Sequence, residues 1–153
     1  MNPHHSLLTG LALMAGAAVS APTAIPAQEA SPVAQYRQSL MESFRMHMGG
    51  VRAALGDAAP IGHAEHHAVA FERMAQALAN AFPAGSAGEG SRALPVIWEN
   101  RNDFMDKVTA LQSATARLVT ATRSGDSDAV GEALQDVQGT CGSCHNVYRG
   151  PAN

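Results

Sequence analysis

The sequence is poor in aromatic residues and in charge. Trp, Tyr and Phe make up 5% of its 153 residues, charged residues make up 15%, and the net charge is −3. A chain without an excess of cations offers no basic surface to a phosphate backbone, which argues against nucleic-acid binding. β-Branched residues other than Val are also scarce, whereas Ala, Met and Leu are plentiful. This balance favours an all-α protein, and the length predicts one domain.

Cysteine is scarcer still, and both copies lie near the end of the chain. Cys141 and Cys144 stand two residues apart in "TCGSCHNVYRGPAN", with His145 directly behind them. The pattern C-x-x-C-H is the attachment signature of c-type haem. On a helix the two sulfurs project on nearly the same side, where they can form thioethers with two vinyl groups of one porphyrin, and the histidine follows as an axial ligand. We therefore expect one covalent haem c, with its iron bound by His145.

Three other interpretations of the cysteine pair remain open. A thiol–disulfide redox pair needs a depressed thiol pKa at a helix N-terminus, but this motif falls deep in a predicted helix. A zinc site needs four ligands, and the chain has no second Cys pair, although its histidines could contribute. A structural disulfide would close a very small loop and would leave His145 without a role.

The N-terminal segment "MNPHHS" lacks Lys and Arg, and an apolar stretch over residues 7–21 follows it. That stretch is shorter than the roughly 20 residues of a membrane-spanning helix, and small residues and prolines come after it. We interpret residues 1–27 as a signal peptide cleaved after Ala27, with sites near Ala21 and Ala24 as alternatives, which leaves a domain over residues 28–153. A retained segment that associates with the membrane is the other interpretation. The expected location is the periplasm, with no stable membrane span.

Apolar residues recur every three or four positions in four segments separated by Gly and Pro, over residues 32–55, 63–81, 95–125 and 126–150. Four amphipathic helices with short connections predict an antiparallel up-down-up-down bundle. Residues 82–94 form the longest connection, which we expect to link the helices without packing against them. The predicted buried faces of the first two helices comprise Arg37, Met41, Phe44, Met48, Val51 and Leu55, and then Ala70, Met74, Ala77, Leu78 and Ala81.

A haem motif at the C-terminal end of four helices resembles the class II cytochromes c, that is, cytochrome c′ and its low-spin, methionine-ligated relatives. The stretches that carry the resemblance are "YRQSLM", "LPVIWENRNDF" and "CGSCHNVYR". The resemblance implies a haem near the C-terminus, with Cys141 and Cys144 as the thioether positions and His145 as the proximal ligand.

The same resemblance assigns roles to three polar residues. Arg37 and Gln38 match an Arg-Gln pair beside the haem, near a propionate, and Arg149 matches a basic residue beside the proximal imidazole. A guanidinium on an apolar face needs an anion, which independently supports the role of Arg37. The alternatives are that Arg37 extends to solvent at the end of the bundle and that Arg149 is a frayed terminal charge.

Met41 distinguishes the subtypes within the family that the chain resembles. In the low-spin members a methionine at this place binds the iron, whereas in others an apolar residue only covers the sixth position. Both roles stay open for Met41. The expected function is one-electron transfer between redox partner proteins, with no enzymatic activity; the alternative is binding of a small gas such as nitric oxide or carbon monoxide. Relatives also dimerise through their first two helices, and the first helix here is compatible with a homodimer.

Several histidines lie outside the haem motif. The segment "HAEHH" places His63, His66 and His67 at a spacing that can hold a metal ion on a helix surface. We interpret it instead as a solvated helix start. His47 falls near the edge of the first helix's predicted buried face, at the surface or at an interface.

Overall fold

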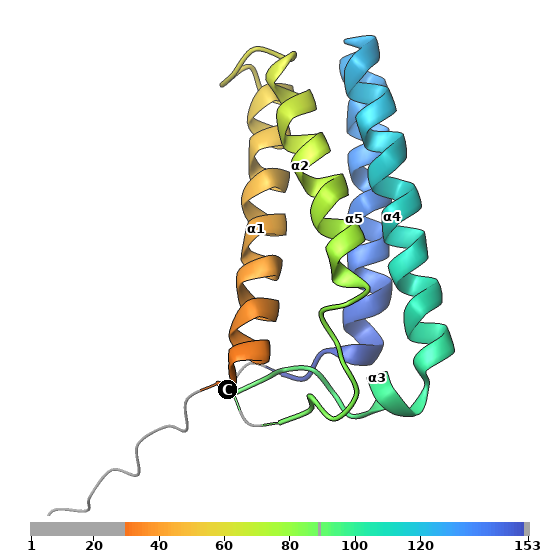
Figure 1. Ribbon diagram of the computed structural model, residues 1–153. Helices are drawn as coiled ribbons and strands as arrows, with labels where there is room; N and C mark the ends of the chain where they lie inside the picture. Colours follow the sequence, from red (N-terminus) through yellow and green to blue (C-terminus); the bar gives the residue numbers. More distant parts are fainter. Residues whose placement is uncertain (1–29, 89, 152–153) are drawn as a thin grey trace, which may run out of the picture.

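Four long helices make up most of the computed structural model, which describes residues 30–88 and 90–151. They are α1 (Pro32–Leu55), α2 (His63–Leu78), α4 (Arg101–Ser124) and α5 (Ser127–Tyr148), and the one-turn helix α3 (Val96–Glu99) precedes α4. Successive long helices run in opposite directions (Figure 1). The predicted all-α, up-down-up-down four-helix bundle is confirmed.

The leader interpreted as a signal peptide, residues 1–27, lies outside the described residues, and its cleavage after Ala27 stays a prediction. In the described part of the chain, no helix combines the length and the apolar character that crossing a membrane requires.

Local signals in the sequence set the ends of the long helices. Ser31 caps α1 by accepting a hydrogen bond from the Ala34 amide at 3.2 Å, and Pro32 occupies the first helical position. Gly125 ends α4 in the left-handed region at φ 71°. The Asp126 carboxylate accepts hydrogen bonds from two first-turn amides of α5 at 2.9 and 3.3 Å. These boundaries match the predicted ones.

Two predicted helices end differently. The third predicted helix is interrupted at Asn100, whose backbone leaves the helical region at φ −116° and ψ 54°. The break occupies a single residue, so the apolar period continues across it and does not predict the interruption. The second helix stops at Leu78, and the Arg101 side chain donates hydrogen bonds to two carbonyl groups of the turn that follows, those of Ala79 and Phe82.

The buried face of α2 differs from the predicted one. The buried residues of this helix are Ala64, Ala68, Phe71, Ala75 and Leu78. Of the predicted stripe, only Leu78 and the following Ala81 are buried. Alanines cover several sides of α2, so they specify no face, and Phe71, its largest apolar side chain, turns toward the core. In α1 the prediction holds for Arg37, Phe44 and Val51, while Met41, Met48 and Leu55 are only partly buried.

Phe71 is fully buried and stacks on Phe44 of α1, with ring centroids 4.8 Å apart. We expect Phe71→Ala to lower the free energy of unfolding by about 3–5 kcal/mol, because it leaves a ring-sized cavity between the helices. Denaturant titration measures the change. Met46→Ala is the control, because Met46 is 63% exposed. Equal unfolding midpoints for the two variants would contradict this packing.

The connection before α3 packs against the bundle, contrary to the prediction that it only links. The Arg37 guanidinium of α1 donates a hydrogen bond to the Ser86 carbonyl at 2.6 Å. At the other end, the Gly150 amide after α5 donates to the Arg92 carbonyl at 2.7 Å. The connection therefore ties the start of α1 to the end of α5, at the lower end of the bundle in Figure 1.

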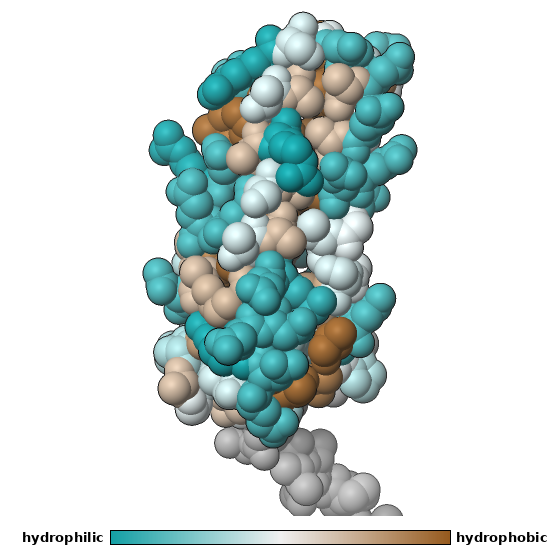
Figure 2. All heavy atoms as spheres, turned by 90° about the vertical axis from the view of Figure 1, so that its right-hand side faces the viewer, coloured by the Kyte–Doolittle hydropathy of each residue, from teal (hydrophilic) through white to brown (hydrophobic). Residues whose placement is uncertain are grey.

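The side of the molecule on the right in Figure 1, where α4 lies, is covered mainly by hydrophilic side chains (Figure 2). Side chains of intermediate hydropathy lie between them, and strongly apolar ones are visible toward the upper left and the lower right of this view. The exposed large hydrophobic residues in the described part of the chain are Tyr36, Met46 and Val147.

Candidate functional site

A cavity of about 600 Å³ opens among α1, α4 and α5. A volume of this size is typical of a site for a small molecule or cofactor. α1 packs against α2, α2 against α4 and α4 against α5, whereas α1 and α5 make far fewer direct contacts. The apolar lining residues include Met41, Phe44, Met48, Leu78, Phe82, Ile97, Phe104, Val108 and Leu111.

The haem motif lines this cavity from α5. Cys141, Cys144 and His145 all lie inside the helix and are partly buried, and the two cysteines are not bonded to each other. Burial raises the pKa of both thiols, which is opposite to the depressed pKa that a redox pair needs. Within the described ranges, no group of three or more metal-ligating side chains supports a zinc site. The pair instead presents two thiols, one helical turn apart, to one cavity.

His145 offers its imidazole to the same cavity. Burial lowers its pKa, and the nearby cations Arg149 and Arg92 lower it further. The neutral imidazole, which is the form that binds iron, is therefore favoured. Arg149 lies close to His145, and its role beside a proximal imidazole stays a prediction. Sequence reasoning missed Arg92, because nothing in a Gly-rich connection shows where it packs.

Arg37 is a buried cation without an anionic partner among the described residues. Only 4% of its surface is exposed, its guanidinium lies over the ring of Phe82 at 5.0 Å, and burial lowers its pKa. Nη2 is hydrogen-bonded to Ser86, but Nε and Nη1 have no partner. Unpaired N–H groups on a buried charge lower the stability of the fold. We therefore expect a hydrogen-bond acceptor for Arg37 inside the cavity that it lines. A haem propionate is a carboxylate of this kind, so the site fits the group that the motif implies.

Gln38 also lines the cavity, next to Arg37 on α1. Its side-chain amide donates a hydrogen bond to the Gly90 carbonyl at 2.8 Å. Gln38 thus joins the connection before α3 to α1, and its position beside a propionate stays a prediction.

Met41 lines the cavity from α1, and the motif lines it from α5. Its side chain is partly buried and packs against the core. Met48 lies two turns further along α1 and lines the same cavity. Both thioethers are therefore available to the interior of the site.

The end of α5 is fixed to α4 by a contact that the sequence did not reveal. The buried Tyr148 hydroxyl donates a hydrogen bond to the Asp103 carboxylate at 2.5 Å, and its ring meets Phe104 edge-on, with centroids 5.2 Å apart. Burial and the contact with Asp103 raise the pKa of Tyr148 to about 12. Lys107 lies 3.9 Å from the same carboxylate. Helical spacing places Tyr148 on the inner face, but it does not name a partner on another helix.

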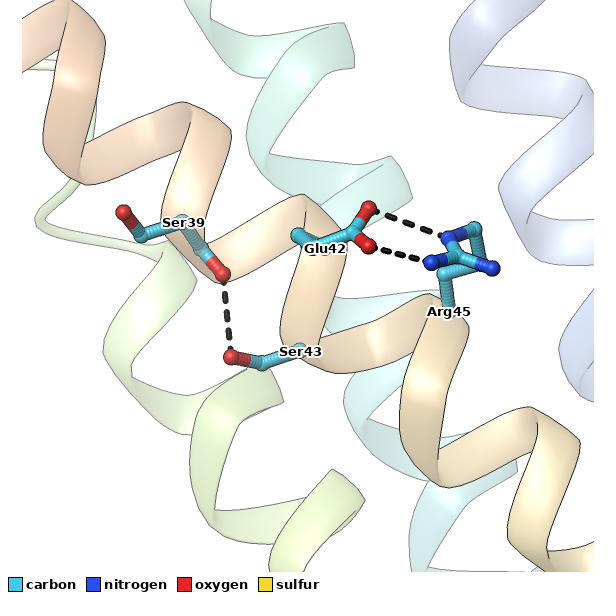
Figure 3. A network of polar contacts seen from close by, with 4 residues as sticks. All are labelled: Ser39, Glu42, Ser43 and Arg45. Atoms are coloured by element: carbon cyan, nitrogen blue, oxygen red, sulfur yellow. Dashed lines mark hydrogen bonds and ion pairs between the residues drawn. The ribbon is translucent and has the colours of Figure 1, made fainter.

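The outer edge of the cavity carries an exposed ion pair on α1. Glu42 and Arg45 both line the cavity, and their side chains lie against each other within one turn of the helix (Figure 3). On the same stretch, the Ser43 hydroxyl donates a hydrogen bond to the Ser39 carbonyl (Figure 3). Exposed pairs of this kind contribute little to stability, so Glu42 and Arg45 chiefly set the polarity of the cavity rim.

Fold and site together define a four-helix bundle with one interior site for a covalently attached porphyrin near its C-terminus. The sequence model of the cytochrome c′ family matches residues 32–149. Cytochrome c′ of Pararhodospirillum photometricum is 34% identical over 126 residues, which cover 78% of this chain and 99% of that protein. A cytochrome c-556 of Agrobacterium tumefaciens (strain B2A) is 41% identical over 75 residues, 49% of this chain and 60% of that protein.

Solved structures agree with these relatives. A nitric oxide complex of a variant of cytochrome c prime from Alcaligenes xylosoxidans superimposes with a TM-score of 0.72 at 27% identity, over 78% of this chain and 94% of that one. A carbon monoxide complex of another variant of that protein gives a TM-score of 0.71 over the same shares. The chain belongs to the cytochrome c′ family. The family binds haem c covalently through two cysteines, and both are present here.

Proposed function

We propose that the protein is a one-electron carrier that holds a single haem c in the cavity among α1, α4 and α5. In this assignment Cys141 and Cys144 form the thioethers and His145 is the proximal ligand of the iron. The bound haem supplies the ferric–ferrous couple. The protein fixes the ligands on a rigid helix and surrounds them with apolar side chains, which keep water away from the iron.

The observation that carries this proposal is that Met41 and His145 line one cavity from two different helices, α1 and α5. We assign Met41 as the second axial ligand. A soft thioether favours the ferrous form and raises the reduction potential, which suits a carrier. With His145 and Met41 both holding the iron, no position on it would be left for a substrate, which suits a carrier rather than an enzyme.

The polar side chains around the cavity complete the assignment. Arg37 and Gln38 would lie on the propionate side, and the two unpartnered nitrogens of Arg37, Nε and Nη1, would donate hydrogen bonds to the carboxylate. Arg149 lies beside the proximal imidazole. Electrons would pass to redox partner proteins at the exposed haem edge. In this proposal the chain is exported to the periplasm after cleavage of residues 1–27, and it is compatible with a homodimer through α1 and α2.

Voltammetry of the haem-loaded protein tests the carrier role. We expect one reversible one-electron wave. Arg37→Met should lower its potential by on the order of 50 mV, because a cation close to the haem stabilises the electron-rich ferrous state. Arg37→Lys, which keeps the charge, is the control. Absence of a reversible wave would contradict the carrier role, and equal potentials for the Met and Lys variants would contradict the placement of Arg37.

Gas binding is the second candidate, and it is favoured by the nitric oxide and carbon monoxide complexes of the Alcaligenes xylosoxidans protein. It would use the same cavity, with Met41 covering the iron without binding it. The two candidates differ in whether ferrous haem has a vacant position. Rapid saturable binding of carbon monoxide would favour gas binding, and resistance to it would favour electron transfer.

A further inference from the structure

Two histidines from different helices meet on the face that α1 and α2 share. Nδ1 of His47 on α1 lies 3.1 Å from Nδ1 of His67 on α2, and both side chains are partly buried. Their ring planes are inclined at 53°. Neither residue lines the cavity of the proposed haem site. The pair is therefore a separate feature that the proposed function does not use.

Gly50 makes room for this pair. A Cβ atom at Gly50 would lie 2.4 Å from the ring of His67, which is closer than any real contact. A glycine inside a helix costs about 1 kcal/mol relative to alanine, so its presence here needs a reason. The space that it leaves lets the His67 ring lie against α1 and reach His47. The neighbouring Gly49 serves no such purpose, since a Cβ there would meet nothing within 4 Å.

The distance between the two nitrogens suits a shared metal ion. With metal–nitrogen bonds of about 2.0–2.1 Å, two nitrogens 3.1 Å apart subtend an angle of roughly 100° at the metal, between the square-planar and tetrahedral values. Without a metal ion, the 3.1 Å contact between the two nitrogens fits an N–H···N hydrogen bond in which one imidazole is the donor. A metal ion would take the place of that proton, which would move to Nε2 of the same ring, and would accept a lone pair from each Nδ1.

We propose that His47 and His67 bind one divalent late transition-metal ion, Cu(II) or Zn(II), per chain. Imidazole nitrogen is a preferred ligand of both ions. In the described part of the chain no third protein ligand joins the pair, so water would fill the remaining positions. The site does not depend on the proposed electron-carrier function.

His63 and His66 provide the competing explanation for any metal binding. They lie on the first turns of α2, both are exposed, and their ring centroids are 6.1 Å apart. A site there would rest on α2 alone and would not require His47. The experiment therefore has to separate the pair between helices from this exposed pair.

Calorimetric titration of the chelator-treated, haem-loaded protein with Cu(II) tests the proposal. We expect one ion per chain. His47→Gln and His67→Gln should each weaken binding by roughly 100-fold. Each variant leaves the ion one imidazole ligand and removes the second, which the fold holds at high effective concentration. Gly50→Ala should weaken it comparably by displacing the His67 ring, while Gly49→Ala is the matched control and should leave it unchanged. The haem spectrum of each variant confirms that the protein is folded.

A double variant, His63→Gln with His66→Gln, completes the test and should retain binding. Loss of Cu(II) binding in this double variant would overturn the proposal. Undiminished binding by His47→Gln and His67→Gln would also overturn it. A stoichiometry of one ion per two chains would exclude a site built within a single chain.

Discussion

Replacing both cysteines, in the variant Cys141→Ala/Cys144→Ala, is expected to abolish covalent haem completely. The two thiols line one cavity a single helical turn apart, and the chain has no other cysteine that could form a thioether. Denaturing electrophoresis with peroxidase staining for haem measures the outcome. The parent protein should give a stained band at its own size, and the variant should give none.

The control for this change lies between the two cysteines. Ser143 is exposed on the same turn of α5, so Ser143→Ala should keep the stain. Circular dichroism of the double variant distinguishes loss of attachment from loss of the helical fold. A stained band in the double variant, or an unstained parent protein, would contradict covalent attachment at Cys141 and Cys144.

Met41→Leu is expected to convert the iron from low spin to high spin. Leucine nearly preserves the volume of the side chain but has no sulfur, so the sixth position loses its ligand while the cavity stays filled. The reduction potential should fall by on the order of 100 mV, because the thioether no longer stabilises the ferrous state. Electron paramagnetic resonance of the ferric protein and voltammetry measure the two effects.

Met48→Leu is the matched control for that experiment. Met48 lines the same cavity from the same helix, and the substitution makes the same chemical change two turns away. It should leave the iron low-spin and the potential within error of the parent. An unchanged spin state in Met41→Leu would reject Met41 as a ligand, and a spin change in Met48→Leu would move the assignment to Met48.

The long helices could be predicted closely because local chemistry determines their ends. Ser31 and Pro32 begin α1, Gly125 ends α4 and Asp126 caps α5, and each signal acts within a few residues. The break at Asn100 could not be predicted, because a one-residue interruption leaves the apolar period intact. The prediction of the buried face of α2 was wrong because its many alanines fit several possible buried faces. Which face is buried depends on the packing of Phe71 in the assembled bundle.

In the candidate site too, the residues that local sequence identifies could be predicted, and those positioned by packing between distant segments could not. Cys141, Cys144 and His145 stand together in the sequence as a C-x-x-C-H motif, which by itself indicates covalent haem attachment. Arg37 could be singled out because a cation on an apolar helix face is unusual. The structure adds that two of its nitrogens are buried without a hydrogen-bond partner. Arg92 packs through contacts with Gly150, 58 positions further along the chain, and no local pattern encodes such contacts.

The contact between Tyr148 and Asp103 joins positions 45 residues apart. Helical spacing correctly places Tyr148 on the inner face of α5, but its partner depends on the register between α4 and α5. That register is a product of core packing, in which Phe104 lies beside Tyr148. Pair contacts between helices are therefore the part of the site that required the structure.

The optical spectrum of the ferrous protein, recorded before and after addition of carbon monoxide, tests the central claim most directly. An iron bound by His145 and Met41 is low-spin and has no vacant position, so the spectrum should be low-spin and should stay unchanged under carbon monoxide. A high-spin ferrous spectrum that shifts when the gas is added would contradict the electron-carrier assignment and would favour gas binding at an open haem.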